Sequence, residues 1–424
     1  MNSIVNQDSQ ITVGLDIGSK KIKCAIGQVQ DNQKRVNLLG FSEIESSGIK
    51  KGTIINRDEL IDKIEQVINN AELMADIKVT GLTLSITGEH IKCINTQAAI
   101  SLNYTNGISN GSREKIINKN DILQVLNSSQ SISLPIDRDI LHTIPQEYSV
   151  DTLEEIKNPL GMTGRRLESK VHLITAATAA MNNFVSCVEE LGLSVEGLVF
   201  QPIASSLSTL KKDEMELGIT LVDLGYTTTN IAVYHKGSIR HSGIIPIGSK
   251  SITNDIAVML QIGLEESEKI KIKYASALAS MSSPELNINI SNIGDDDKRS
   301  ISENEISKYV EARMQEIFQM VIQEISRADV KDPLTYGIVL TGGGASLRNL
   351  IPLLEKSLGV KVRLGKPTKI DGAKDIADGP SYATSMGLLL WSLYDIDYSH
   401  LQNNQDQGFI RIIKKIRETI ENMF

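Results

Sequence analysis

The stretch "ITVGLDIGSKKIKCAIGQV", residues 11–29, predicts an apolar strand, a polar turn that opens with Asp16 and Gly18, and a second apolar strand. The stretch "LGITLVDLGYTTTNIAVYHKG", residues 217–237, repeats this layout and places Asp223 and Gly225 at the equivalent positions. Over the rest of the chain, apolar strands alternate with amphipathic helices, as in α/β proteins. The repeat therefore predicts an α/β fold with two halves built alike.

One Asp-x-Gly turn is weak evidence for a binding site, because glycine with a positive φ is common in tight hairpin turns. Two such turns that face each other can present successive backbone N–H groups as concave binding sites for phosphates. Asp16 and Asp223 would then hold Mg²⁺ through its water molecules, since this ion prefers octahedral oxygen coordination. The pair of turns thus favours a nucleotide site.

Two further segments fit the same site. The segment "YGIVLTGGGASLRNL", residues 336–350, predicts a strand, then Gly342, Gly343 and Gly344, then a helix. Glycines there would allow close approach of the backbone to a nucleotide, although such turns are common in any α/β fold. In "SEKIKIKY", residues 267–274, Glu268 and Lys271 lie one helical turn apart, which by itself fits a solvated ion pair equally well.

Composition excludes several classes of protein. The chain has 424 residues, and since single cores stop growing at about 250–300 residues, we expect at least two domains. A net charge of −8 and an aromatic content of 4% argue against nucleic-acid binding. The three cysteines lie far apart, as free thiols in a reducing compartment do. The N-terminus lacks the features of a signal peptide, and no apolar run reaches the roughly 20 residues of a membrane span. We therefore expect a cytoplasmic protein.

Hydrophobic periodicity predicts the main helices and strands. Helices are expected at 58–73, with Asp58 as a possible cap, and at 120–129, 176–192, 250–262 and 304–326, and strands near 139–150 and 165–175. An insertion of about ninety residues, which includes "LTLSITGEHIKC", precedes residue 176. The polar segment "DYSHLQNNQDQ", residues 397–407, is expected to be a flexible linker, because it cannot bury enough apolar area to fold alone.

The C-terminal segment "GFIRIIKKIRETIENMF", residues 408–424, predicts an amphipathic helix with basic residues opposite an apolar face. Such a helix suits the interface of an anionic membrane. Docking on its own domain or a coiled coil are alternatives, but the polar linker and a length of barely two heptads favour neither. The residues expected to bind the membrane are Phe409, Ile412, Ile413, Lys414, Lys415, Ile416, Arg417, Ile420, Met423 and Phe424.

The order Asp-x-Gly turn, second Asp-x-Gly turn, Gly-Gly-Gly is the phosphate–phosphate–adenosine order of the actin/DnaK/sugar-kinase ATPase superfamily. Within it, the chain closely resembles the FtsA family of bacterial cell-division proteins over essentially its whole length. The segments that carry this resemblance include "HTIPQEY", "IKNPLGMTG", "IGSKSITNDIA" and "LTGGGASLRNL". The first two are specific to the family and lie in the insertion that gives it an extra subdomain.

The resemblance implies an actin-like two-lobed ATPase fold with an inserted subdomain. The first lobe (1A) would comprise 1–84 and 168–200, the inserted interaction subdomain (1C) 85–167, and the second lobe (2A and 2B) 201–396, with 2B at about 240–310. The linker would span 397–407 and the amphipathic helix 408–424. The residues that match the ATP and Mg²⁺ site are Asp16, Gly18, Ser19 and Lys21 in the first phosphate loop, Asp223, Gly225, Thr227 and Thr228 in the second, Glu268 and Lys271 in the adenosine-side helix, and Gly342, Gly343 and Gly344 in the adenosine loop.

Two departures from the pattern bear on hydrolysis. The family usually has Asp-x-Gly-Gly-Gly-Thr in the second loop, whereas this chain has Tyr226 and Thr227 in place of two glycines. A β-branched residue disfavours positive φ, so a distorted loop is expected. Gln201 stands where DnaK-type relatives have a glutamate, and it is the candidate for orienting the attacking water. Glutamine is no base, so ATP binding with weak or no hydrolysis is expected.

The resemblance also implies a role. The protein would polymerise on the cytoplasmic face of the inner membrane at the division site, bind the C-terminal peptide of FtsZ, and recruit later division proteins through the inserted subdomain. The alternatives are an actin-like scaffold of pilus or secretion machinery, which the "IPQEY" segment disfavours, and a metabolic kinase, which has no use for a membrane helix. A DnaK-type chaperone is excluded by the length of the chain.

Overall fold

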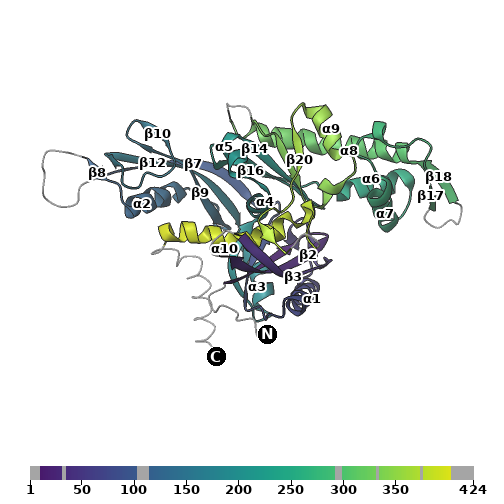
Figure 1. Cartoon of the computed structure of the whole chain (residues 1–424), viewed down its shortest axis with the longest axis horizontal. Coiled ribbons are helices and arrows are strands. Elements are labelled where there is room, and N and C mark those ends of the chain that lie inside the picture. Colours follow the sequence, from purple (N-terminus) through teal and green to yellow (C-terminus); the bar gives the residue numbers. More distant parts are fainter. Residues whose placement is uncertain are drawn as a thin grey trace. The chain divides into compact units, whose positions relative to one another are not determined.

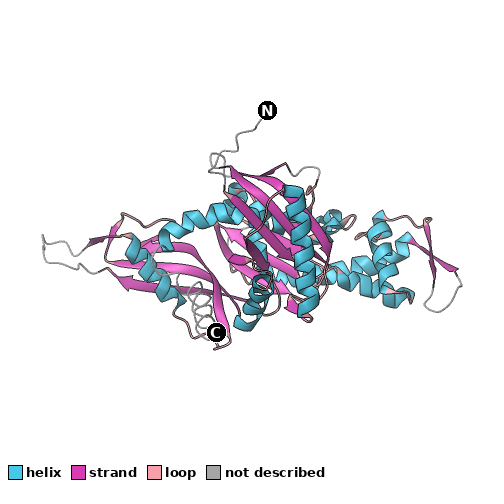
Figure 2. Cartoon of the chain, turned by 90° about the horizontal axis from the view of Figure 1, so that it is seen from below, coloured by secondary structure: helices cyan, strands magenta, loops and turns pink. Residues whose placement is uncertain are grey.

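The computed structural model describes residues 10–30, 35–102, 114–291, 298–330, 334–372 and 376–402. The chain divides into two compact units. The larger unit comprises residues 1–95, 133–146 and 172–390, and the smaller unit comprises 96–132, 147–171 and 391–424. Figure 1 labels the elements, and Figure 2 separates helices from strands.

A six-stranded sheet in the larger unit contains the first predicted hairpin. Its order is β13-β6-β1-β2-β3-β21. The strands are β1 (Ile11–Ile17), β2 (Lys21–Gln30), β3 (Arg35–Glu45), β6 (Gly81–Ile86), β13 (Ser194–Phe200) and β21 (Ile370–Asp371). Strand β1 pairs antiparallel with β2 and parallel with β6. The segment "LTLSITGEHIKC" was expected in the insertion, but its first half forms β6 of this sheet, because its short apolar run is buried beside β1.

A five-stranded sheet in the same unit contains the second hairpin. Its order is β16-β15-β14-β19-β20. The strands are β14 (Ile219–Leu224), β15 (Thr229–His235), β16 (Ser238–Ile245), β19 (Ile338–Thr341) and β20 (Val362–Leu364). Strand β14 pairs antiparallel with β15 and parallel with β19, so it repeats the surroundings of β1. The predicted duplication is confirmed.

Most helices lie where the periodicity predicts them. The helices of the larger unit are α1 (Arg57–Ala75), α3 (Thr178–Glu189), α4 (Gln201–Thr209), α5 (Lys212–Leu217), α6 (Lys250–Leu260), α7 (Leu264–Tyr274), α8 (Glu303–Ser326) and α9 (Leu350–Leu358), and α10 (Ala383–Gln402) begins there. Two expectations are wrong. Asn56, not Asp58, caps α1 by accepting from the Glu59 backbone N–H. Helix α10 continues to Gln402 through the start of the expected linker, because an existing helix can extend over polar residues by adding backbone hydrogen bonds alone.

Helix α4 contacts strands of both sheets, and α10 packs beside it (Figure 1). The close approach depends on Gly387 of α10, since a Cβ there would lie 1.7 Å from the Ala204 carbonyl oxygen of α4. On the other side of the first sheet, α1 packs against β2 and β3. The two central strands, β1 and β14, are therefore buried apart from Ile11, and their ends meet the site described below.

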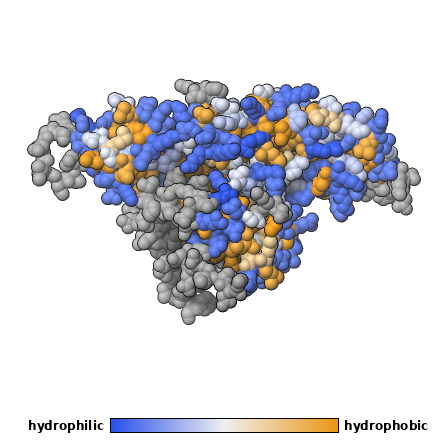
Figure 3. All heavy atoms as spheres, viewed as in Figure 1, coloured by the Kyte–Doolittle hydropathy of each residue, from blue (hydrophilic) through white to orange (hydrophobic). Residues whose placement is uncertain are grey.

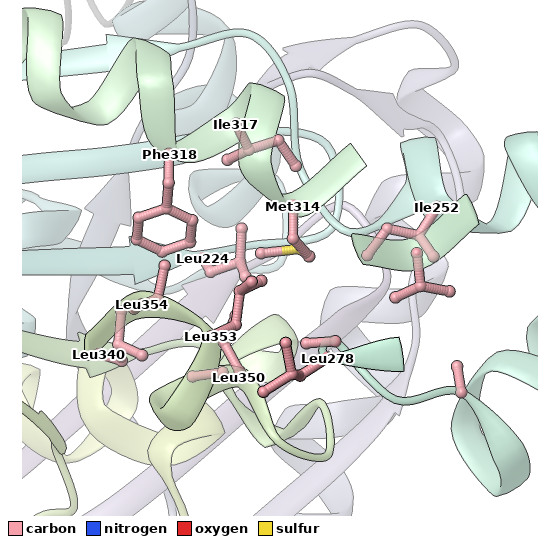
Figure 4. Packing of buried hydrophobic residues seen from close by; sticks show 14 of the residues in the cluster. Leu224, Ile252, Leu278, Met314, Ile317, Phe318, Leu340, Leu350, Leu353 and Leu354 are labelled. Atoms are coloured by element: carbon pink, nitrogen blue, oxygen red, sulfur yellow. The ribbon is translucent and has the colours of Figure 1, made fainter. Parts of the chain in front are cut away.

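The core of the second sheet is formed mainly by α8, α9 and strand side chains. Figure 4 shows Met314, Ile317 and Phe318 of α8 close to Leu340, Leu353 and Leu354. The buried residues of α8 recur every three or four positions, which is the spacing of one helix face. Burial of each large apolar side chain contributes roughly 1.5–3 kcal/mol, so this face determines where α8 lies.

The smaller unit has its own core. Its elements include α2 (Lys119–Gln130), β8 (Lys115–Ile116), β10 (Leu153–Ile156) and β11 (Thr163–Gly164), with parts of β7 (Lys92–Ser101), β9 (Arg138–Val150) and β12 (Arg166–Ala177). Three strand pairings give the sheet order β10-β9-β12-β7. Leu102, Ile117, Ile122, Val125 and Leu167 are buried in its core. The remaining short strands among the described residues are β4 (Ile49–Lys50), β5 (Thr53–Ile54), β17 (Asn287–Ser291) and β18 (Lys298–Ser302).

On the face shown in Figure 3, hydrophilic residues cover most of the coloured surface and apolar residues form separate patches. No helix within the described residues is long and apolar enough to cross a membrane. The expected amphipathic helix, 408–424, and residues 403–407 of the expected linker lie outside the described residues.

Candidate nucleotide-binding site

The ends of β1 and β14 border a cavity of about 410 Å³, within the size range of small-molecule sites. The sequence-predicted residues that line it are Asp16, Gly18, Ser19, Lys21, Gln201, Asp223, Gly225, Glu268, Lys271, Gly342, Gly343 and Gly344. Thr227 and Thr228 do not line it. The structure thus brings together residues that span more than three hundred positions of the chain.

The two hairpin turns have the same geometry. The Gly18 backbone N–H donates to the Lys21 carbonyl at 3.1 Å, and the Gly225 N–H donates to the Thr228 carbonyl at 2.9 Å. A Cβ on Gly18 or Gly225 would lie 2.7 or 2.8 Å from the same carbonyl oxygens. A side chain at either position would clash with the backbone of its own turn, so each turn requires glycine.

The expected distortion of the second loop by Thr227 is wrong. None of the described residues in the two turns, 16–21 and 223–228, has a positive φ, so a β-branched residue causes no backbone strain there. Instead, the Thr227 hydroxyl donates to the Ser19 hydroxyl at 2.7 Å. Thr228 is buried and closes the turn through its carbonyl. Both threonines support the loops from outside the cavity.

Asp16 and Asp223 are almost fully buried at the adjoining strand ends. Asp16 accepts a hydrogen bond from the Ser85 hydroxyl at 2.8 Å, and Asp223 accepts one from Ser205 at 2.8 Å. Burial raises the pKa of Asp16. Burial also raises the pKa of Asp223 to about 6, the Ser205 hydrogen bond opposes this rise, and the charge of Asp16 adds to it. The nearby charge of Lys23 lowers the pKa of both carboxyl groups, and a further cation beside two buried carboxylates would likewise be stabilising.

These two carboxylates suit Mg²⁺ held through water better than a directly coordinated metal. Among the described residues, no group of three or more His, Cys, Asp or Glu side chains is placed to hold a metal ion. Mg²⁺ typically keeps several waters and takes one or two carboxylates together with substrate phosphates. Asp16 and Asp223 supply that number of carboxylates, and water molecules would connect them to the ion.

The glycine segment forms a cradle that side chains would fill. Gly342 has φ +83° and ψ 166°, a conformation essentially limited to glycine. A Cβ there would lie 2.4 Å from Oδ1 of Asp223, and one on Gly344 would lie 2.5 Å from Leu224 Cγ. Gly343 is exposed to the cavity. The predicted order of strand, glycines and helix is confirmed, with a 3₁₀ turn, Gly343–Ser346, between the glycines and the start of α9 at Leu350.

The adenosine-side candidates belong to a charged cluster. Glu268 pairs with Lys271 at 2.7 Å and also with Lys20 of the first turn. Lys271 donates to the Thr253 hydroxyl at 2.9 Å and the Ser249 carbonyl at 3.2 Å. Burial raises the pKa of Glu268, but hydrogen bonds from Lys20, Lys271 and Thr253 outweigh it and lower the pKa overall. Glu268 therefore carries its charge at neutral pH.

Gln201 begins α4 and its amide is held by two neighbours. Its carbonyl oxygen accepts from the Asn230 side chain at 2.9 Å, and its amide nitrogen donates to the Thr384 hydroxyl at 3.3 Å. Thr384 also lies 3.4 Å from Asp223. This chain of contacts fixes Gln201 at the wall of the cavity.

Sequence reasoning missed several lining residues: Lys20, Lys23, Tyr226, Ser249, Arg348, Ser381 and Thr384. Lys23 lies in a strand that is buried on both faces, and its ammonium group donates to the Ser381 carbonyl. A lysine within an apolar strand was a usable signal for a buried cation. Ser381 and Thr384 carried no signal, because only the fold brings them to the cavity.

Comparison with known proteins identifies the family. Residues 220–387 match the family model "Cell division protein FtsA", and residues 88–175 match "SHS2 domain inserted in FTSA". The chain is 37% identical to the cell division protein FtsA of Pseudomonas aeruginosa over 99% of both chains. It is 34% identical to that of Escherichia coli K12 over 90% of both.

Solved structures show the same fold at low sequence identity. The PilM–PilN type IV pilus biogenesis complex matches with a TM-score of 0.65 and 16% identity, covering 90% of this chain and 98% of the other. MreB5 of Spiroplasma citri bound to ADP matches with a TM-score of 0.55 and 12% identity, covering 93% and 99%. These similarities confirm the expected actin-like ATPase fold. The sequence matches over nearly the whole chain show that it belongs to the FtsA family of cell division proteins.

Proposed function

We propose that this chain acts in bacterial cell division as an ATP-binding, actin-like protein that polymerises on the cytoplasmic face of the membrane. In this proposal it tethers FtsZ by the C-terminal peptide of FtsZ and recruits later division proteins through the inserted subdomain, 85–167. Membership of the FtsA family supports the role in division.

ATP binding is supported above all by the two equivalent turns and the glycine cradle around one cavity. The turns offer backbone N–H groups to phosphates, and Gly342–Gly344 leave room for close approach of a nucleoside. Bound Mg²⁺ would neutralise part of the phosphate charge. Asp16 and Asp223 would hold its water molecules, and their mutual repulsion would be relieved by the ion. The solved MreB5 structure with the same fold is bound to ADP.

Slow hydrolysis is part of the proposal. The amide of Gln201 is held by Asn230 and Thr384 at the cavity wall. An amide can orient a water molecule, but it cannot accept the proton that a general base takes. We therefore assign Gln201 a positioning role. We expect bound ATP to support assembly, and we expect its hydrolysis to be slow.

The membrane part of the proposal rests on the sequence of residues 408–424. A single short amphipathic helix binds membranes reversibly. Polymerisation would link many such helices, and each bound helix would raise the effective concentration of the next. ATP-supported assembly would in this way convert a weak anchor into a firm one.

Substitution of Asp16 tests nucleotide binding. Asp16→Ala should weaken Mg·ATP binding at least about tenfold, or about 1.4 kcal/mol, as measured by calorimetry on the full chain. Asp62→Ala, on the exposed side of α1, is the matched control and should bind like the parent. Equal affinities for the parent and Asp16→Ala would contradict the assignment of the site.

The partner distinguishes this proposal from a pilus scaffold, which shares the fold through PilM–PilN. A column that carries the C-terminal peptide of FtsZ should retain the full chain at low and moderate salt. A peptide of the same composition in scrambled order is the control. Passage of the protein through both columns would count against the division role.

A further inference from the structure

Lys20 lies at the tip of the first turn, next to Ser19, and lines the cavity. Its ammonium group pairs with Glu268, 248 positions away on α7. This ion pair and the Ser19–Thr227 hydrogen bond are two links between the first hairpin and the elements around the second. The family pattern does not include Lys20 among the residues that are expected to bind a nucleotide.

Tyr226 places three ammonium groups close together. Its ring centroid lies 5.2 Å from Nζ of Lys20 and 5.6 Å from Nζ of both Lys250 and Lys271. A cation within about 6 Å of an aromatic ring is attracted by the ring face. Tyr226 stands where the family pattern usually has glycine, which has no ring to attract these ammonium groups. Its effect is to gather positive charge beside the second phosphate turn.

Among the three donors to Glu268, Lys20 is the one best able to leave. The Lys271 side chain is 9% exposed and Lys20 is 34% exposed. Lys271 also donates to Thr253 and Ser249, whereas Lys20 reaches Glu268 from the turn of the first hairpin. If Lys20 departs, Glu268 keeps its bonds to Lys271 and Thr253. The Glu268 carboxylate would keep two partners, so the exchange avoids the free-energy penalty of a buried charge without a partner.

We propose that Lys20 is an additional phosphate-binding residue of this chain, which Glu268 holds beside the cavity and which transfers to the outer phosphates of a nucleoside triphosphate. Tyr226 keeps the ammonium group near the turns during this exchange. This inference rests on the proposed function, since it requires nucleotide in the cavity. The outer phosphates of a triphosphate can compete with Glu268 for Lys20 through charge-assisted hydrogen bonds, whereas a monophosphate lacks those phosphates.

The ratio of ATP affinity to AMP affinity tests the exchange. It is measured by calorimetry with Mg²⁺ on the full chain, and both nucleotides share the adenosine contacts. Lys20→Met should lower this ratio about tenfold, the loss expected for one charge-assisted contact, and Lys20→Arg should restore most of it. Lys269→Met, which removes a lysine paired with Glu265 on α7, is the control and should leave the ratio unchanged.

A second variant separates Lys20 from general electrostatics. Glu268→Gln frees Lys20 and should raise the ratio, but it also removes a negative charge from the cavity. In the double variant with Lys20→Met, the rise should disappear if Glu268 acts through Lys20. A ratio that is unchanged in Lys20→Met, or a rise that persists in the double variant, overturns the inference and leaves the proposed function standing. If the parent chain binds neither nucleotide, both the inference and the proposed function are overturned.

Discussion

Among single residues, Asp223 couples stability to pH. Its pKa is raised to about 6 from 3.8 in the folded state, mainly by burial. The folded protein therefore holds a proton that the unfolded chain has lost between about pH 4 and 6. Since the folded state binds more protons there, the free energy of unfolding falls as pH rises through this window, and Asp16 acts in the same direction. Without nucleotide or Mg²⁺, the free energy of unfolding above pH 6 is lowered by an amount on the order of 2–3 kcal/mol.

Asp223→Asn should remove this cost, because the amide keeps an oxygen that accepts from Ser205 and carries no charge. We expect the Tm of the nucleotide-free variant to exceed that of the parent at about pH 7.5, and the difference to vanish near about pH 4, where Asp223 is protonated in the parent. Asp62→Asn, an exposed control, should show no such trend. A difference in Tm that does not depend on pH would argue against a raised pKa.

Gly342 and Gly343 are adjacent and yet respond differently to a methyl group. Gly342→Ala should lower the free energy of unfolding by about 2 kcal/mol or more and weaken ATP binding, since it combines a glycine-only conformation with a Cβ 2.4 Å from Asp223. A Cβ on Gly343 would meet no atom within 4 Å among the described residues. Gly343→Ala should therefore fold with parental stability. Chemical denaturation of both variants makes the comparison, and equal losses would refute it.

At the level of elements, the two hairpins are joined at their tips by Thr227 and Ser19. Replacing Thr227 by the glycine usual in the family should not improve the site, because no positive φ is required there. Thr227→Gly should instead lower the free energy of unfolding by about 1–2 kcal/mol, through loss of the hydrogen bond and gain of freedom in the unfolded chain. Weaker ATP binding should accompany it, as the two turns lose a link.

Two further substitutions assign the effect of Thr227. Thr227→Ser keeps the hydroxyl and should retain ATP affinity, whereas Thr227→Val keeps the branched shape and should lose it. Thermal melts and calorimetry provide both readouts. Tighter ATP binding by Thr227→Gly would show that the side chain obstructs the loop.

For the whole molecule, removal of the membrane anchor is predicted to leave the nucleotide site unchanged. Deletion of 408–424, or Ile413→Glu combined with Ile416→Glu, should abolish co-sedimentation with anionic liposomes, because buried apolar side chains contribute roughly 1.5–3 kcal/mol each at full burial and less at an interface. ATP affinity should not change. The control variant Glu421→Gln, which changes the predicted polar face, should still sediment with the liposomes. Sedimentation of the truncated chain with these liposomes would show that another part of the protein binds them.

The sequence by itself determined the elements and their duplication. Strand and helix periods are local properties, so the hairpins at 11–29 and 217–237 and helices such as α1 and α8 could be predicted from the spacing of apolar residues. The resemblance was enough to expect the actin-like fold and many of the residues that line the cavity, although Thr227 and Thr228 do not line it and Lys20 and Lys23 were missed. Ends of elements were predicted less well, as at Asn56 and Gln402, because caps depend on single hydrogen bonds rather than on a period.

Only the tertiary structure decided which side chains meet. The pairing of Lys20 with Glu268 spans 248 positions, and Ser85, Ser205 and Thr384 reach the two aspartates from three different elements. Such contacts depend on the register of strands in two sheets and on how closely α4 and α10 approach, and no local period encodes these. The same holds for the pKa of Asp223, which follows from burial and from a second carboxylate 207 positions away in the chain.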